Sequence, residues 1–83
     1  MLSFDEFKAK KMLSKYAHDV WSRFMTHLFS KSIENSDGTV TIPKDLVSRW
    51  KRQIETEYED LSEKEQKSDQ DEADNILTLI KSL

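Results

Sequence analysis

The stretch that decides the fold is residues 13–31, LSKYAHDVWSRFMTHLFSK. Apolar side chains recur in it at spacings of three and four residues, which places a wide apolar stripe on one side of a helix. No glycine or proline interrupts the pattern. We therefore predict one long helix that packs against other elements. The stripe consists of Leu13, Tyr16, Ala17, Val20, Trp21, Phe24, Met25, Leu28 and Phe29.

The residues before this stretch predict a separate helical extension over residues 1–12. Ser3 and Glu6 have the spacing of a capping box, in which a serine and a glutamate three residues later satisfy the first N–H groups of a helix. The polar run at residues 8–11 indicates a point where the chain frays or turns before the long helix.

A turn and a short extended arm follow the long helix. The sequence Asn-Ser-Asp-Gly at residues 35–38 is typical of a turn, with Gly38 at a position that needs positive φ. Residues 39–42, Thr-Val-Thr-Ile, alternate in polarity and predict a ribbon strand or an arm over the helices. Pro43 suits the first turn of the next helix.

Two more helices are predicted in the rest of the chain. Apolar residues from Leu46 to Ile54 lie on one helical face, and that helix should end near Thr56. A second capping box, Ser62 to Glu65, begins the last helix. Its first half has no apolar residue and its second half has several, so we expect it to dock by its C-terminal half.

The length and composition predict a single all-α domain over residues 1–83, with residues 13–83 as its core module. A chain of 83 residues has a thin core. We expect a compact domain of three to four helices with a short extended arm between the first long helix and the next. The predicted core is Leu13, Val20, Trp21, Phe24, Leu28, Leu46, Val47, Trp50, Ile54, Leu61, Ile76, Leu77 and Ile80.

Several function classes are excluded by composition. The chain has no cysteine and one glycine, so it has no thiolate metal site and no glycine-rich phosphate loop. No serine lies in a nucleophile elbow. His18 and His27 are nine residues apart on one helix, too far for a shared metal site. We therefore expect a protein that is not an enzyme, with no metal and no cofactor.

Charge is distributed unevenly along the chain. Residues 1–52 carry ten Lys or Arg and six Asp or Glu, a net +4, whereas residues 53–83 carry three Lys and ten Asp or Glu, a net −7. The two halves can attract each other or be solvated, or the basic half can bind an anionic ligand. Binding to duplex nucleic acid is disfavoured, because the acidic end repels phosphates. No apolar run is long enough to cross a bilayer, so we expect no membrane association and a cytoplasmic location.

A group of tryptophans and arginines is the candidate ligand-binding site. Arg49 and Arg52 are three residues apart on a helix and flank Trp50, which suits a planar ligand that carries a phosphate. Trp21 and Arg23 extend this candidate site. The alternative is that both Trp side chains are core and that the arginines pair with the acidic last helix.

Two segments resemble a ryanodine-receptor-type repeat, a small helical module also found in bacterial and phage proteins. AHDVW at residues 17–21 resembles its H-x-x-W helix, and YEDLSEKE at residues 58–65 resembles the start of its last helix. The resemblance covers residues 13–82. The chain differs from the module at residues 29–32, where the module has a glycine-rich turn, and across residues 37–57, which replace a His-Pro.

Two functions of different class follow from these observations. The resemblance implies a non-catalytic phage protein, acting in the host cytoplasm, that sequesters a nucleotide-derived immune signal. Because 83 residues can hardly enclose a pocket of roughly 300 Å³, we expect that ligand to bind between copies in a homo-oligomer. The alternative is a helical inhibitor or adaptor that binds a host protein through its acidic last helix. The residues for that second function are Glu63, Glu65, Asp69 and Glu72.

Overall fold

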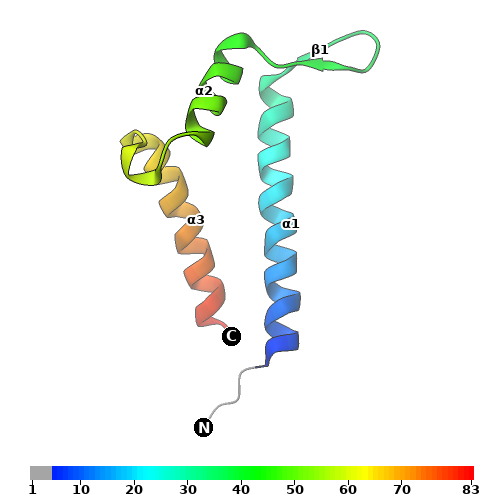
Figure 1. The fold of residues 1–83 in the computed structure, drawn as a ribbon. Helices are drawn as coiled ribbons and strands as arrows, with labels where there is room; N and C mark the ends of the chain where they lie inside the picture. Colours follow the sequence, from blue (N-terminus) through cyan, green and yellow to red (C-terminus); the bar gives the residue numbers. More distant parts are fainter. Residues whose placement is uncertain (1–4) are drawn as a thin grey trace. The chain divides into compact units, whose positions relative to one another are not determined.

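The computed structural model describes residues 5–83 and shows three helices with a short extended arm after the first (Figure 1). The all-α fold predicted from the sequence is confirmed, and so is the arm between the first and second helices. In chain order the elements are α1 (Glu6–Lys31), β1 (Ile33–Glu34), β2 (Val40–Thr41), α2 (Lys44–Ile54), the 3₁₀ turn η1 (Tyr58–Asp60) and α3 (Glu63–Lys81).

The chain divides into two compact units, Met1–Thr41 and Ile42–Leu83. The first unit contains α1 and the β1–β2 hairpin, and the second contains α2, η1 and α3. A single domain over residues 1–83, with residues 13–83 as its core module, stays a prediction.

α1 is one continuous helix, which corrects the predicted break near residue 12. It begins at Glu6, where the Asp5 carboxylate accepts a hydrogen bond from the Lys8 N–H at 3.0 Å. The polar residues at positions 8–11 are helical, because lysine and alanine are good helix formers. The predicted cap residue Ser3 lies outside the described residues. The helix ends at Lys31, and the Ser32 N–H donates to the Phe29 carbonyl at 3.2 Å.

The turn at residues 35–38 closes an antiparallel hairpin. Ile33 pairs with Thr41 and Glu34 pairs with Val40. Gly38 has a φ of 90°, which glycine adopts at little cost and other residues rarely adopt. The predicted turn and extended segment are thus confirmed, and the arm takes the form of a two-stranded ribbon.

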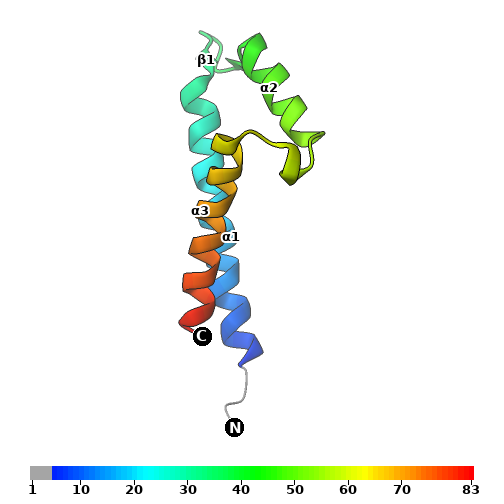
Figure 2. The ribbon, with the colours of Figure 1, turned by 90° about the vertical axis from the view of Figure 1, so that its left-hand side faces the viewer.

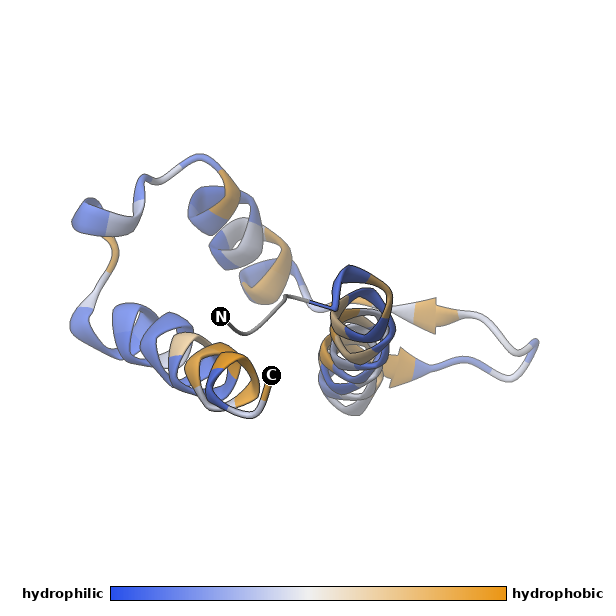
Figure 3. Ribbon diagram, turned by 90° about the horizontal axis from the view of Figure 1, so that it is seen from below, coloured by the Kyte–Doolittle hydropathy of each residue, from blue (hydrophilic) through white to orange (hydrophobic). Residues whose placement is uncertain are grey.

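The second unit joins α2 to α3 through a short connector (Figures 1 and 2). α2 follows Pro43, which occupies the N-cap, and it ends at Ile54 rather than near Thr56. α3 begins with the predicted capping box, in which the Ser62 hydroxyl accepts from the Glu65 N–H and the Glu65 carboxylate accepts from the Ser62 N–H. Figure 3 shows that α3 changes from hydrophilic in its first half to hydrophobic near the C-terminus.

The predicted core is not buried in the structure. Among residues 5–83, Ala9 alone is classed as a buried apolar residue. Every residue that the sequence predicts in the core remains at least partly exposed to solvent. Trp21 is 60% exposed and Ile54 is 83% exposed. The physical reason lies in the size of the units. The first unit contains one helix and a hairpin whose strands have two residues each. These elements are too few to cover the apolar stripe of α1.

Candidate functional site

The candidate ligand-binding residues of α2 point to different sides of the helix. Trp50 is half-buried and shares a side of α2 with Leu46 and Ile54, by helical spacing. Arg52 follows Trp50 by two positions, and residues two apart on a helix do not face each other. A ligand site at Arg49, Trp50 and Arg52 stays a prediction, and helical spacing places the Trp50 indole and the Arg52 guanidinium on different sides of α2. Arg49 and Arg52 do share a side, as their spacing predicts.

Arg52 is engaged by a carboxylate of its own chain. Its Nη2 donates to Oε2 of Glu65 at 2.6 Å, across the connector between α2 and α3. The Arg52 side chain is half exposed and that of Glu65 is mostly covered. Glu65 takes an Nη2 donor of this guanidinium, so a phosphate there would share Arg52 with Glu65 and use the N–H groups that remain. Pairing with the acidic helix, the alternative drawn from the sequence, is the arrangement in the structure.

Glu65 combines two structural roles. One carboxylate oxygen accepts from the Ser62 N–H at 3.1 Å and from the Ser62 hydroxyl at 2.9 Å, and the other accepts from Arg52. The Arg52 hydrogen bond, followed by the Ser62 N–H, holds the pKa of Glu65 at about 2, below its ordinary value of 4.5. Glu65 was also a candidate partner-binding residue, but its oxygens are already bound within the chain.

Three further side chains at this connector were missed by the sequence analysis. The Gln66 amide donates to the carbonyls of Tyr58 and Glu59, at 2.9 and 3.3 Å. The Gln70 amide donates to the Tyr58 hydroxyl at 2.9 Å. Gln66 and Gln70 are four residues apart on α3, so one helix face reaches η1 twice. That spacing is the only sequence signal for these contacts, and it is weak.

The remaining acidic candidates lie along the first half of α3. Glu63 and Asp69 are exposed, and Glu72 is half-buried. Asp69 lies on the same side of α3 as Ile76 and Ile80, which follow it by seven and eleven positions. Glu63 lies on another side. Of the predicted partner-binding residues, Asp69 is thus the one best aligned along the helix with these apolar side chains.

The apolar half of α3 is not covered by the other elements of its own unit. Four large side chains there keep between two fifths and about half of their surface exposed. They are Ile76 (40%), Leu77 (50%), Ile80 (52%) and Leu83 (45%). The docking predicted for this half does not occur within the second unit, and docking elsewhere stays a prediction.

The candidate residues of α1 lie in the other unit. The Trp21 indole stacks on the His18 imidazole, with ring centroids 5.9 Å apart and planes inclined by 28°. The Ser22 hydroxyl lies 3.4 Å from Nε2 of His18. Arg23 is exposed on the same helix. Trp21 and His18 therefore form a local pair of rings, three residues apart.

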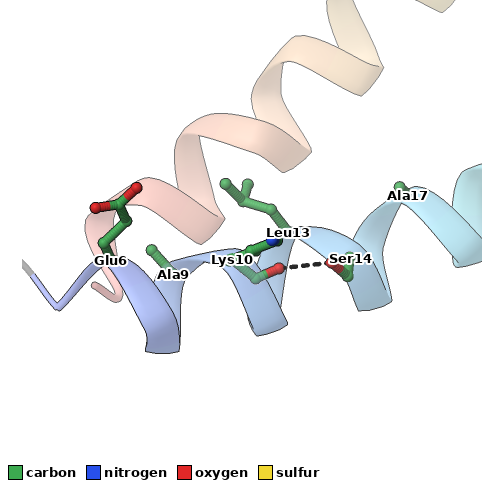
Figure 4. A pocket seen from close by; sticks show the side chains of 6 residues that line it. All are labelled: Glu6, Ala9, Lys10, Leu13, Ser14 and Ala17. Carbon is green, nitrogen blue, oxygen red and sulfur yellow. Dashed lines mark hydrogen bonds between the residues drawn. The ribbon is translucent and has the colours of Figure 1, made fainter.

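A shallow depression of about 420 Å³ lies on the first half of α1. Figure 4 shows its lining side chains along the helix, with the Ser14 hydroxyl donating to the Lys10 carbonyl at 2.7 Å. None of the sequence-predicted site residues lines it. The lining residues are Glu6, Ala9, Lys10, Leu13, Ser14 and Ala17.

Two searches of the described residues bear on the expected chemistry. Within residues 5–83, no cluster of three or more histidine, aspartate or glutamate side chains has the geometry to hold a metal ion. Over the same residues, none of the helices combines the length and the apolar character needed to span a membrane.

Comparison with known proteins yields no relative for this chain. No family model, no curated protein and no solved structure matches it.

Proposed function

We propose that the chain is a non-catalytic binding protein that engages another protein through α3. The observation that carries this proposal is the exposed apolar half of α3, which continues on one side of the helix into Asp69. Helices that present such a face bind in apolar grooves, with side chains at spacings of three and four residues as anchors.

The negative charge of α3 indicates which charges the partner surface should carry. The helix carries six Asp or Glu and three Lys, a net −3, and most of the acids precede the apolar half. A complementary surface has an apolar groove with basic residues at the end that meets Asp69, because opposite charges across an interface favour encounter and set orientation. In the phage setting that the sequence resemblance implies, the partner is a host protein.

The test compares charge reversals on two sides of α3. Asp69→Lys changes the proposed binding face, and Asp74→Lys makes the same charge change about 140° away around the helix. Ile80→Ser removes an apolar anchor from the binding face. Tagged parent and variant chains are exposed to host lysate and retained proteins are identified by mass spectrometry, with far-UV circular dichroism to verify that each variant keeps its helices.

The expected result is a protein retained by the parent and by Asp74→Lys, and lost by both Asp69→Lys and Ile80→Ser. Equal retention by all four chains would contradict the proposal. Loss on Arg49→Ala alone would contradict it as well, and would favour the second candidate function.

The second candidate is binding of a nucleotide-derived ligand, the function that the sequence resemblance implies. The observation that favours it is Arg49, an exposed side chain next to the half-buried Trp50. Among the described residues, no hydrogen bond or ion pair occupies its guanidinium. An open side chain of this kind can meet a phosphate. Because 83 residues cannot easily enclose a pocket of roughly 300 Å³, the ligand would bind between copies in a homo-oligomer.

Calorimetry with cyclic and linear nucleotides tests this candidate. Arg49→Ala should abolish the heat of binding, whereas Lys51→Ala, which removes a cation from another side of the same helix, should preserve it. The mass in solution with and without the nucleotide shows whether copies associate. The absence of heat from every nucleotide at high protein concentration would remove the candidate.

A further inference from the structure

The tip of the β1–β2 hairpin contains an Asp-Gly pair in which the Asp37 carboxylate and the Gly38 N–H both form hydrogen bonds. Asp37 and Gly38 lie at the exposed turn of the ribbon. Among aspartates, one followed by glycine is the most prone to rearrange through a cyclic imide, because glycine leaves its own amide nitrogen unhindered. No heavy atom lies within 4 Å of the place where a Cβ of residue 38 would sit, so the side of the turn that a side chain would occupy is open.

We propose that Asp37–Gly38 is a site of spontaneous isoaspartate formation, and that the folded hairpin suppresses the reaction by holding both reacting groups. In the reaction the Gly38 nitrogen attacks Cγ of the protonated Asp37 carboxyl group, and one water leaves to form a succinimide. Water then adds to one imide carbonyl. Opening at the side-chain carbonyl restores aspartate, and opening at the main-chain carbonyl gives isoaspartate. No oxidant or reductant is consumed, and the mass is unchanged.

The hairpin keeps the side chain of Asp37, the group that would be attacked, in its ionised form. One oxygen of Asp37 accepts from the Thr39 hydroxyl at 2.6 Å and from the Thr39 N–H at 3.0 Å. These hydrogen bonds lower the pKa of Asp37, the hydroxyl contributing most. Since the ring closes on the neutral carboxyl group, a carboxylate that is both ionised and held toward Thr39 reacts slowly.

The hairpin also holds the nucleophile. The Gly38 N–H donates to the Asn35 carbonyl at 3.1 Å, so its nitrogen must leave this hydrogen bond before it can turn toward Cγ of Asp37. The Asn35 N–H in turn donates to the Thr39 carbonyl at 2.8 Å. Reaction therefore requires the tip of the hairpin to open.

Isoaspartate at residue 37 would prevent the hairpin from closing again. The main chain would then run through Cβ and Cγ and gain one carbon atom between residues 37 and 38. The pairing of Glu34 with Val40 depends on the present length of the turn. The modification would convert a transient opening into a lasting loss of the ribbon.

The experiment measures isoaspartate in the whole chain at neutral pH, in buffer and in urea, by peptide mapping with electron-transfer fragmentation. Thr39→Val removes the hydroxyl that donates to the Asp37 carboxylate and accepts from the Asn35 side-chain amide at 2.9 Å. Thr41→Val makes the same chemical change at a residue that accepts only from the Asn35 amide. Each rate is divided by the rate of the same chain in urea, which cancels the direct effect of the new side chain.

In buffer the parent should form isoaspartate far more slowly than in urea. Thr39→Val should raise the relative rate about threefold to tenfold, the loss expected for a typical hydrogen bond at an exposed site, and Thr41→Val should raise it less. The proposal is overturned if the parent reacts equally fast in buffer and in urea, if Thr41→Val matches Thr39→Val, or if no isoaspartate forms in urea.

Discussion

Two connections in this chain bring helices or strands together by different means. The hairpin tip at residues 35–39 is held by hydrogen bonds that span at most six residues, the longest from the Asn35 amide to the Thr41 hydroxyl at 3.1 Å. The connector between α2 and α3 depends on a bond that spans 13 residues, from Arg52 to Glu65. The first connection is local, whereas the second exists only after two helices have formed.

The difference lies in what each connection requires of the chain. The hairpin requires one residue with positive φ, and Gly38 supplies it. The connector requires side chains from separate elements to meet, since Arg52 comes from α2 and Glu65 from the first turn of α3. A single backbone change should therefore disrupt the hairpin, whereas the connector should lose its contacts one at a time.

The largest expected effect is at the backbone of the hairpin. Gly38→Ala should destabilise the ribbon by roughly 1–2 kcal/mol, the cost of placing an L-residue in a left-handed conformation. No atom crowds the new Cβ, so the cost is conformational. NMR amide exchange at Asn35, whose N–H is bonded across the hairpin, measures the opening. Ser36→Ala is the control, and equal exchange in the two variants would show that the conformation of Gly38 does not limit the ribbon.

The second effect is at the start of α3. Ser62→Ala removes the hydroxyl that accepts from the Glu65 N–H at 3.2 Å, and loss of such a cap costs about 1 kcal/mol. Urea unfolding followed by far-UV circular dichroism measures the change. Ser68→Ala, within the same helix, should leave the midpoint unchanged. A Ser62→Ala midpoint equal to that of the parent would mean that the cap adds nothing.

A smaller effect should appear at acid pH. The pKa of Glu65 is lowered from 4.5 to about 2, so its contribution to stability is complete above about pH 4.5 and is lost as the pH falls toward about 2. Glu65→Gln keeps an oxygen for Ser62 but cannot titrate. Helix content measured against pH should therefore fall less steeply in this window for Glu65→Gln. If the two curves superimpose, groups other than Glu65 are responsible for the loss of helix at acid pH.

The smallest effect is expected at Tyr58. Tyr58→Phe removes the hydroxyl that accepts from the Gln70 amide at 2.9 Å, an exposed contact worth about 0.5 kcal/mol. Gln70→Ala should cost a similar amount. Because the two side chains share this contact, the double variant should lose less stability in urea unfolding than the two single variants together. Strict additivity would show that the two side chains do not interact.

The same difference between local and long-range contacts separates the features that could be predicted from the sequence from those that could not. The capping box at Ser62 and Glu65 was correctly predicted, because both residues act within one turn of one helix. The helix around Trp50 was also correctly predicted, whereas a ligand site there stays a prediction. Residues two positions apart point to different sides of a helix, so Trp50 lies on the apolar side while Arg52 binds Glu65 of α3.

Local sequence determined the helices, their caps and the hairpin turn, since each depends on residues a few positions apart and on a single backbone conformation at Gly38. Tertiary structure alone decided that Arg52 binds Glu65 and that the second unit by itself leaves the apolar half of α3 exposed. An apolar stripe specifies that a helix can be covered, but the number and size of its neighbours decide how much of that stripe is covered.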